Sequence, residues 1–232
     1  MGAAPARDAM LRRGPNLRAQ AYDSFTRHLL ARDIRAGQFI SQRELVALTG
    51  LPLGAIRELV PRLEAEGLIR TAPQRGMQVA HVDLHLIRDA FQFRLFLERQ
   101  AVESFAANAS DETVGRLRQD HAAILAESEA ARAGSGICAD LIDRAQAIDW
   151  QLHATIIDAL GNAIIADAYR VNAIKIRLIK QEQTRLNDAI VIPTMLEHIA
   201  VIDAIATRDP VRASDVLATH ILNARDRAAS LR

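Results

Sequence analysis

The sequence predicts a mainly α protein, with an N-terminal winged helix-turn-helix followed by a C-terminal antiparallel α-helical bundle. Beyond residue 83, apolar residues recur at the spacing of amphipathic helices almost to the end of the chain. Between residues 41 and 69, two short amphipathic segments flank a turn with the sequence Thr49-Gly50-Leu51-Pro52. After Gly67, two short extended runs are joined by a glycine-containing turn. The first feature predicts the bundle, and the other two predict the winged unit.

The N-terminal elements follow in order. Residues 1–16 lack the apolar core of a signal peptide and are expected to form a loose arm. Residues 17–81 should form a winged helix-turn-helix DNA-binding domain, because its second short helix can enter the major groove of DNA. The wing is expected from residues 68–70 and 77–80, which are joined by a turn through residues 73–76.

The bundle should occupy residues 84–232, with only a short link between it and the wing. Asp111 and Asp209-Pro210 indicate helix starts, and Gly161-Asn162 indicates a helix end. Facing helices of such bundles often build metal and ligand sites. Apolar periodicity predicts helices near residues 84–108, 111–132, 139–160, 163–183, 191–207 and 210–230.

Four residues of the bundle form a candidate metal site. Asp149 and His153 are four residues apart in a helical stretch, so their side chains share one helix face. His198 and His220 also lie in apolar helical segments. Taken alone, a helical histidine is more often a surface or singly hydrogen-bonded residue than a ligand. Imidazole and carboxylate ligands suit zinc, nickel, iron or manganese.

The C-terminal pattern resembles the FCD domain in the FadR branch of GntR-type bacterial transcription regulators, in its VanR-like six-helix form. The resemblance covers most of the chain. Asp149, His153, Glu197-His198 and His220 match the metal-binding motif of that family. It implies a divalent metal cofactor, with zinc favoured over nickel, iron or manganese. It also implies a homodimer, a palindromic double-stranded DNA operator and a small organic acid effector.

The N-terminal segment is similar to the GntR winged helix-turn-helix in Arg43-Glu44-Leu45 and Arg57-Glu58, and in the opening and closing segments around them. The resemblance implies that Arg43, Arg57, Arg75 and Gly76 contact DNA. The chain departs from the pattern at Pro52-Leu53-Gly54, which removes a serine N-cap and a basic side chain. Pro61 falls inside the second helix and deletes a backbone hydrogen bond, so an irregularity is expected near Arg57.

A second candidate site lies on the first bundle helix. Arg94 stands in an apolar segment, so it should either pair with a carboxylate such as Glu98 or await one from a ligand. The family resemblance favours the ligand, because FCD pockets bind small organic acids through the metal and nearby arginines. Asn172 and Arg177 are further candidates for effector binding, and the alternative for both is a solvated helix face.

Composition agrees with a regulator of this kind. Residues 1–80 hold 12 arginines and 7 acidic residues, whereas residues 81–232 hold 17 basic and 21 acidic residues. The basic first part suits a polyanionic partner, although arginine richness also fits a coding bias. No segment is apolar for long enough to span a membrane, and a single cysteine, Cys138, suits a reducing cytoplasm.

The predicted function is therefore a DNA-binding transcription regulator, expected to be a repressor, whose operator binding responds to a small carboxylate bound at the metal site. Two alternatives stay open. A metal-dependent enzyme could use the Asp149 and histidine site on a small organic acid, although no HExxH motif accompanies the ligands. Alternatively, the metal could be purely structural and the bundle a dimerisation block.

Overall fold

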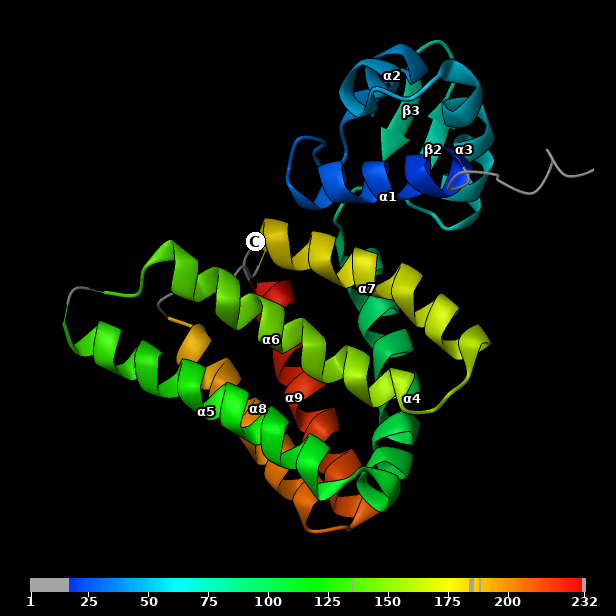
Figure 1. The fold of residues 1–232 in the computed structure, drawn as a ribbon. Helices are drawn as coiled ribbons and strands as arrows, with labels where there is room; N and C mark the ends of the chain where they lie inside the picture. The colour runs from blue at the N-terminus through cyan, green and yellow to red at the C-terminus, as the bar shows by residue number, and fades with distance from the viewer. Residues whose placement is uncertain (1–16, 135, 184–185, 188, 231–232) are drawn as a thin grey trace, which may run out of the picture. The chain divides into compact units, whose positions relative to one another are not determined.

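The computed structural model describes residues 17–134, 136–183, 186–187 and 189–230. Its contacts divide the chain into two compact units, and the division falls between His81 and Val82. Figure 1 draws the first unit in blue and cyan and the second from green to red. The arm expected from residues 1–16 lies outside the described residues.

The described part of the N-terminal unit consists of helices and a small antiparallel sheet (Figure 1). Strands β2 and β3 form the predicted wing, with Ile69 opposite Val79 and Ala72 opposite Gly76. The strand β1 pairs with the other edge of β3 and was not predicted, because two residues show no strand period. The elements are α1 (Leu17–Leu30), β1 (Phe39–Ile40), α2 (Gln42–Thr49), α3 (Leu53–Ala65), β2 (Ile69–Ala72) and β3 (Gly76–Val79).

The helix-turn-helix is set by local chemistry at both ends of α2. Ser41 caps its start, since the serine hydroxyl accepts a hydrogen bond from the Glu44 backbone and the Glu44 carboxylate accepts one from the Ser41 backbone at 2.7 Å. Gly50 ends the helix with φ of 69°, a left-handed conformation that glycine adopts without steric cost. These two residues fix where the turn into α3 begins.

The irregularity expected near Arg57 is absent, because α3 is helical without interruption from Leu53 to Ala65 despite Pro61. Its apolar face packs into the core of the unit, with Ile56, Leu59 and Leu63 fully buried. Tertiary packing therefore outweighs the backbone hydrogen bond that the proline removes.

The C-terminal unit is helical throughout its described residues, which confirms the predicted fold class. The helix ends differ from the predicted ones by two residues at most. The helices are α4 (Leu84–Asn108), α5 (Asp111–Ala133), α6 (Ala139–Asp158), α7 (Ala163–Gln183), α8 (Val191–Ala206) and α9 (Pro210–Ser230).

The bundle packs helices that are far apart in the sequence. Helix α4 runs beside α9, and α5 runs beside α8, while α6 contacts α4, α5 and α8 (Figure 1). Helix α7 packs against α4 and α9 as well as α6. An apolar cluster centred on Leu141, Val191 and Met195 joins α6 to α8. This arrangement brings the inward faces of α4, α6, α8 and α9 to a common interior.

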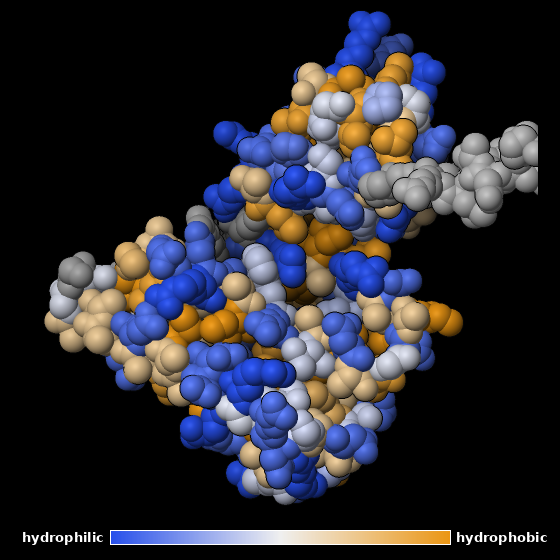
Figure 2. Space-filling view, in the orientation of Figure 1, coloured by the Kyte–Doolittle hydropathy of each residue, from blue (hydrophilic) through white to orange (hydrophobic). Residues whose placement is uncertain are grey.

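Hydrophilic residues are spread over the face of the helical unit shown in Figure 2, with small apolar areas between them. Among the described residues, no helix is both long and apolar enough to cross a membrane.

Candidate metal centre

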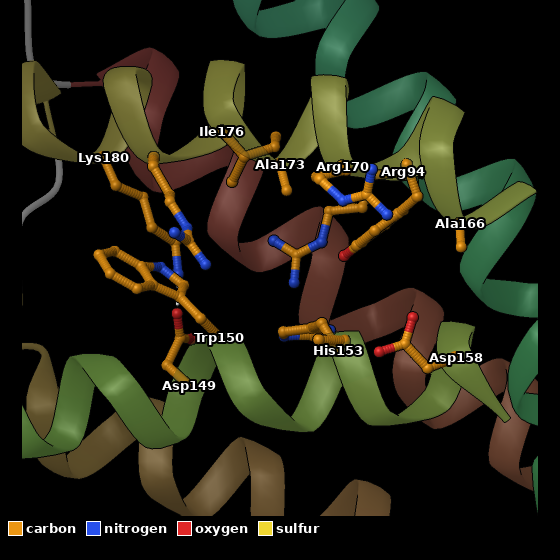
Figure 3. A pocket seen from close by; sticks show the side chains of 13 residues that line it. Arg94, Asp149, Trp150, His153, Asp158, Ala166, Arg170, Ala173, Ile176 and Lys180 are labelled. Carbon is orange, nitrogen blue, oxygen red and sulfur yellow. Dashed lines mark hydrogen bonds and ion pairs between the residues drawn. The ribbon is translucent and has the colours of Figure 1, made fainter. Parts of the chain in front are cut away.

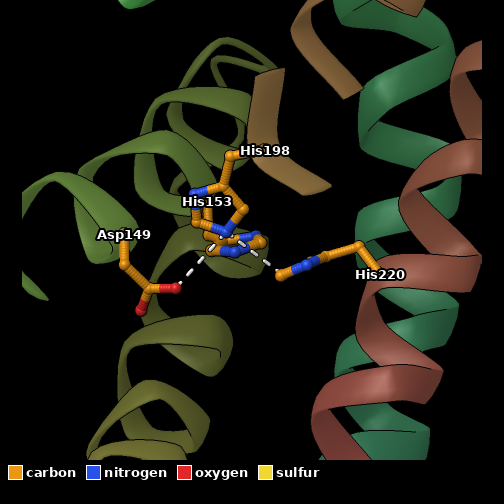
Figure 4. Close-up of side chains that lie close together, drawn as sticks. All are labelled: Asp149, His153, His198 and His220. Atoms are coloured by element: carbon orange, nitrogen blue, oxygen red, sulfur yellow. Dashed lines mark hydrogen bonds and ion pairs between the residues drawn. The ribbon is translucent and has the colours of Figure 1, made fainter. Parts of the chain in front are cut away.

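Four side chains converge in the interior of the helical unit (Figure 4). Helix α6 supplies Asp149 and His153, α8 supplies His198 and α9 supplies His220. Each offers one possible ligand atom, and these atoms lie within 4.8 Å of one another. All four side chains are buried, with at most 3% of any residue exposed. The structure thus brings together the four residues that were predicted to form a metal site.

The shortest separations match ligands around a single ion. Nε2 of His198 lies 3.2 Å from Nε2 of His220 and 3.3 Å from Oδ1 of Asp149. A tetrahedral ion with ligand bonds of about 2.0 Å separates its ligand atoms by roughly 3.3 Å. Side chains already at this spacing need little rearrangement to hold an ion.

Two of the histidines are oriented by a carboxylate on their other ring nitrogen. Nδ1 of His153 lies 2.6 Å from Oε2 of Glu98, and Nδ1 of His220 lies 2.8 Å from Oε2 of Glu197. A carboxylate only accepts, so each Nδ1 carries the proton and each Nε2 keeps its lone pair. Such partners commonly fix the orientation of metal-binding histidines.

The carboxylate of Asp149 is held on one side by cationic and amide donors. Lys180 donates to its Oδ2 at 2.5 Å, and Gln146 donates to the same oxygen at 3.0 Å. Burial alone would raise the pKa of Asp149, but Lys180 and His198 together hold that pKa well below its usual range. Oδ1 is buried and lies 3.3 Å from Nε2 of His198, with no well-aligned hydrogen bond among the described residues. The ionised oxygen that remains is available to a metal.

The protonation of the site favours metal binding. Burial lowers the pKa of His153 to about 4 and the pKa of His220 well below its ordinary value, so both rings are neutral at pH 7. Nε2 of His153 is buried with no hydrogen-bond partner among the described residues. Neutral imidazoles and an ionised carboxylate bind divalent ions, and the ligand atoms here include some that have no hydrogen-bond partner. The site therefore suits a divalent ion.

A cavity of about 190 Å³ adjoins the cluster, between α6 and α7 (Figure 3). Asp149 and His153 line it from α6, so two of the four clustered residues face this space. Its other lining residues include four cationic side chains and a tryptophan, together with smaller apolar residues. The cations are Arg94, Arg170, Arg177 and Lys180.

Arg94 forms the ion pair that the sequence left as an alternative. Its Nε donates to Oε1 of Glu98 at 2.6 Å, and 2% of Arg94 and none of Glu98 is exposed. Burial opposes the charge on both groups, but each stabilises the other, which raises the pKa of Arg94 and lowers the pKa of Glu98. Arg94 also lines the cavity. Arg94 is therefore both paired with Glu98 and part of the cavity wall.

The two further effector candidates lie in different settings, and neither is on a solvated face. Arg177 lines the cavity, with its guanidinium carbon 4.2 Å above the centre of the Trp150 ring. Asn172 is 7% exposed, and its amide donates to the carbonyl of Ala90 at 3.0 Å. Asn172 is not among the residues that line the cavity, and its bond joins α7 to α4.

Several contacts around the cluster were not foreseen from the sequence. The pairing of Lys180 with Asp149, and of Glu197 with His220, joins residues far apart in the chain. His121 lies beside His198, with ring centroids 5.2 Å apart. One signal was available, because Lys180 is four residues after the buried Ile176 and so shares its helix face.

The expected DNA contacts occupy the surface of the N-terminal unit. Arg43 on α2, Arg57 on α3 and Arg75 in the wing turn are all exposed. Gly76 opens β3 with φ of 85°, and a Cβ atom there would come within 2.9 Å of the Ile40 carbonyl oxygen. Only glycine fits this position, so its place in the wing has a structural cause.

The helical unit matches a known domain family. The FCD domain matches residues 89–223, which is more than half of the chain. The chain is 30% identical over 84 residues to the Nta operon transcriptional regulator of Aminobacter aminovorans. That alignment covers 36% of this chain and 40% of the relative, so the chain spans less than half of that protein's length.

A longer alignment and a solved structure extend the match beyond the FCD domain. The chain is 26% identical over 210 residues to the HTH-type transcriptional repressor NanR of Klebsiella aerogenes, covering 80% of this chain and 74% of the relative. A GntR transcriptional regulator from Rhodococcus sp. RHA1 has the same fold, with a TM-score of 0.73 at 16% identity over 93% of this chain and 98% of that one. The chain belongs to the FCD domain family of GntR-type transcription regulators.

Proposed function

We propose that this protein is a DNA-binding transcription repressor whose operator binding changes when a small carboxylate binds at a metal site in the helical unit. The observation that carries the proposal is the buried cluster of Asp149, His153, His198 and His220, which borders a cavity lined by cations. The similarity to a repressor, NanR, supports the direction of regulation. The protein would act in the cytoplasm as a homodimer that binds a palindromic operator.

The proposed cofactor is one divalent metal ion, with zinc favoured over nickel, iron or manganese. Nε2 atoms of the three histidines and Oδ1 of Asp149 would hold it. When bound, the ion supplies a positive centre to which a carboxylate oxygen can bind. Glu98 and Glu197 keep the rings of His153 and His220 turned toward that centre.

The charge of the cavity supports an anionic effector. Four cationic side chains line it, against the carboxylates of Asp149 and Asp158. Three of the four cations already pair with carboxylates of the protein, namely Arg94 with Glu98, Lys180 with Asp149 and Arg170 with Asp167. A ligand that brings a carboxylate would therefore pair with the remaining cation, Arg177.

Arg177 is the strongest candidate to receive that carboxylate. Its guanidinium stacks on the face of Trp150, and burial lowers its pKa. Because a guanidinium binds a carboxylate through two parallel hydrogen bonds, a ligand can satisfy it where Trp150 cannot. Arg94 would also contact the carboxylate from α4. Asn172 joins α7 to α4 through its hydrogen bond to Ala90, so its proposed role is to hold the helices beside the effector.

The proposed DNA contacts are Arg43, Arg57, Arg75 and Gly76. The three arginines are exposed on α2, on α3 and in the wing turn. Helix α3 is the second helix of the helix-turn-helix, the one that enters the major groove in this motif. Arginine reads guanine or binds phosphate, so each of these residues is suited to one of the two roles.

An enzymatic function is not proposed. The relatives with similar sequences are named as transcription regulators, and the cluster lacks the HExxH motif of metal-dependent proteases. An acid bound at the metal should accordingly be recovered unaltered after incubation with the protein.

The test uses the full chain loaded with zinc and a pool of random DNA duplexes. Selected duplexes should share a palindrome, and addition of members of a panel of mono-, di- and tricarboxylates should change the affinity for it by some 5 to 150-fold. Arg177→Gln should bind the duplex normally but respond less to the acid, whereas Arg118→Gln, an exposed arginine paired with Asp203, serves as the control. Failure to select any duplex, or turnover of the acid, would contradict the proposal.

A further inference from the structure

Apart from Nε2 of His153, two buried ring nitrogens at the metal centre lack a hydrogen-bond partner among the described residues. They are Nε2 of His121 and Nδ1 of His198. The two rings belong to α5 and α8, which pack side by side, and their centroids lie 5.2 Å apart in an edge-to-face arrangement. His121 is 1% exposed and His198 is fully buried, so water does not readily satisfy either nitrogen.

The proton on His121 is fixed by its own helix. Nδ1 of His121 lies 2.7 Å from the carbonyl oxygen of Leu117, which can only accept a hydrogen bond. Nδ1 therefore carries the proton, and burial lowers the pKa of the ring to about 4, so it takes up no second proton at pH 7. Nε2 of His121 is left as a hydrogen-bond acceptor that needs a donor.

His198 has its proton on the opposite side in the arrangement observed. Its Nε2 lies 3.3 Å from Oδ1 of Asp149, an ionised oxygen that favours a proton on that nitrogen. Nδ1 then holds a lone pair, and a lone pair cannot donate to Nε2 of His121. A hydrogen bond between the two rings therefore needs the His198 proton on Nδ1.

We propose that His121 is a positioning residue for His198, and that an ion bound at Nε2 of His198 shifts the proton of that ring to Nδ1, from which it is donated to Nε2 of His121. The ring gives its Nε2 proton to water as the ion enters and takes one from water at Nδ1, so the number of protons on the ring is the same before and after. The inference rests on the metal site proposed above. Its result is a continuous connection from the Leu117 carbonyl through His121 and His198 to the ion.

This assignment completes the set of outer contacts around the site. Glu98 orients His153, Glu197 orients His220, and Lys180 holds Asp149. His198 is the one member of the cluster without such a contact among the described residues. Because His121 is on α5, a metal ion bound at His198 would tie α5 to α8 through this hydrogen bond.

The test measures zinc affinity of the full chain by competition with a chromophoric chelator. His121→Leu should raise the Kd for zinc by about 10 to 100-fold, the usual effect of losing an outer-shell partner of a ligand. His121→Gln retains an amide oxygen that can accept, and should recover part of the loss. The control is His85→Leu, the same change at an exposed histidine of the same unit, which should leave the Kd unchanged.

A second readout separates positioning from simple packing. Zinc-free His121→Leu should melt at or above the parent's temperature, because the change removes an acceptor that has no donor. The rise in Tm on adding zinc should be smaller in His121→Leu than in the parent. A residue that only fills space would lower the Tm of both forms equally.

Nitrogen NMR of the parent protein tests the proton shift without any variant. The proton of His198 should be on Nε2 without zinc and on Nδ1 with it. A proton that does not move, or equal zinc affinity in the parent and His121→Leu, would overturn this inference and leave the metal site standing. A parent protein that binds no zinc would overturn both.

Discussion

Oε2 of Glu98 lies 2.6 Å from Nδ1 of His153 in the interior of the helical unit. The other oxygen of the same carboxylate accepts hydrogen bonds from Arg94 and from the hydroxyl of Tyr169, each at 2.6 Å. Glu98 therefore connects an arginine of the cavity wall to a candidate metal ligand. A carboxylate that displaced Glu98 from Arg94 would also act on His153, which offers a physical route from effector to metal site.

Glu98→Gln should weaken both the fold and the metal site. The change leaves Arg94 buried without a negative partner, which should cost about 3 to 5 kcal/mol of unfolding free energy. It also removes the carboxylate that orients His153, so zinc affinity should fall by about 10 to 100-fold. Chemical denaturation and zinc titration would measure the two effects. Asp89→Asn, in an exposed pair with Arg88 on the same helix, is the control and should change little.

Lys180→Met should destabilise the zinc-free protein far more than the zinc-loaded one. Without the lysine, Asp149 is a buried carboxylate that lacks its cation, with a penalty of about 3 to 5 kcal/mol. A bound divalent ion replaces the missing positive charge, so zinc should raise the Tm of this variant by more than it raises the parent's. Thermal unfolding with and without zinc gives the comparison. Equal stability of the two zinc-free proteins would show that the ion pair is dispensable.

The zinc-free protein should lose stability as the pH falls from about 6.5 toward 4. The pKa of His121 and the pKa of His153 are about 4 in the folded chain, below the unfolded value of about 6.5. The unfolded chain binds more protons in this window, so acid favours unfolding, by about 2 kcal/mol per histidine at pH 5. Denaturation at pH 7 and pH 5 in the presence of a chelator measures the loss. His121→Leu should show a shallower dependence, and a flat profile in the parent would refute the prediction.

Arg57→Ala should weaken binding to the selected operator. If Arg57 reads a base, the loss should be about 1 to 3 kcal/mol with relaxed specificity at one position. If it binds only phosphate, affinity should fall alike for operator and random DNA. Gel-shift titrations on both duplexes distinguish the two roles. Binding unchanged on both would exclude Arg57 from the DNA interface.

Much of the fold could be predicted because its signals are local. The periodicity that predicts a helix over residues 84–108 lies within the helix itself, and the observed α4 has the same bounds. The cap at Ser41 and the turn at Gly50 likewise depend on only a few adjacent residues. Strand β1 depends instead on pairing with β3, which is far along the chain. Its two residues alone therefore do not predict a strand. At Pro61 the local signal was misleading, because it predicted an irregular helix and the packing of α3 keeps the helix intact.

The ligands of the candidate metal centre could be predicted from the sequence, but the residues that orient them could not. Asp149 and His153 share a helix face through their spacing alone, whereas His198 and His220 were joined to them through the family motif. The residues that orient the ligands come from other helices, and no spacing rule places Lys180 against Asp149. Glu197 illustrates the limit, because it adjoins His198 in sequence yet orients His220. Tertiary packing determines such pairs.

The measurement that tests the account most directly is the metal content of protein purified without a chelator, by elemental mass spectrometry. The parent should carry one divalent ion per chain, and His198→Ala should lose most of it, because a central ligand of the cluster is removed. His85→Ala, at an exposed histidine of the same unit, should retain the parent's content. Equal metal content in the parent and His198→Ala, or none in the parent, would contradict the proposed site.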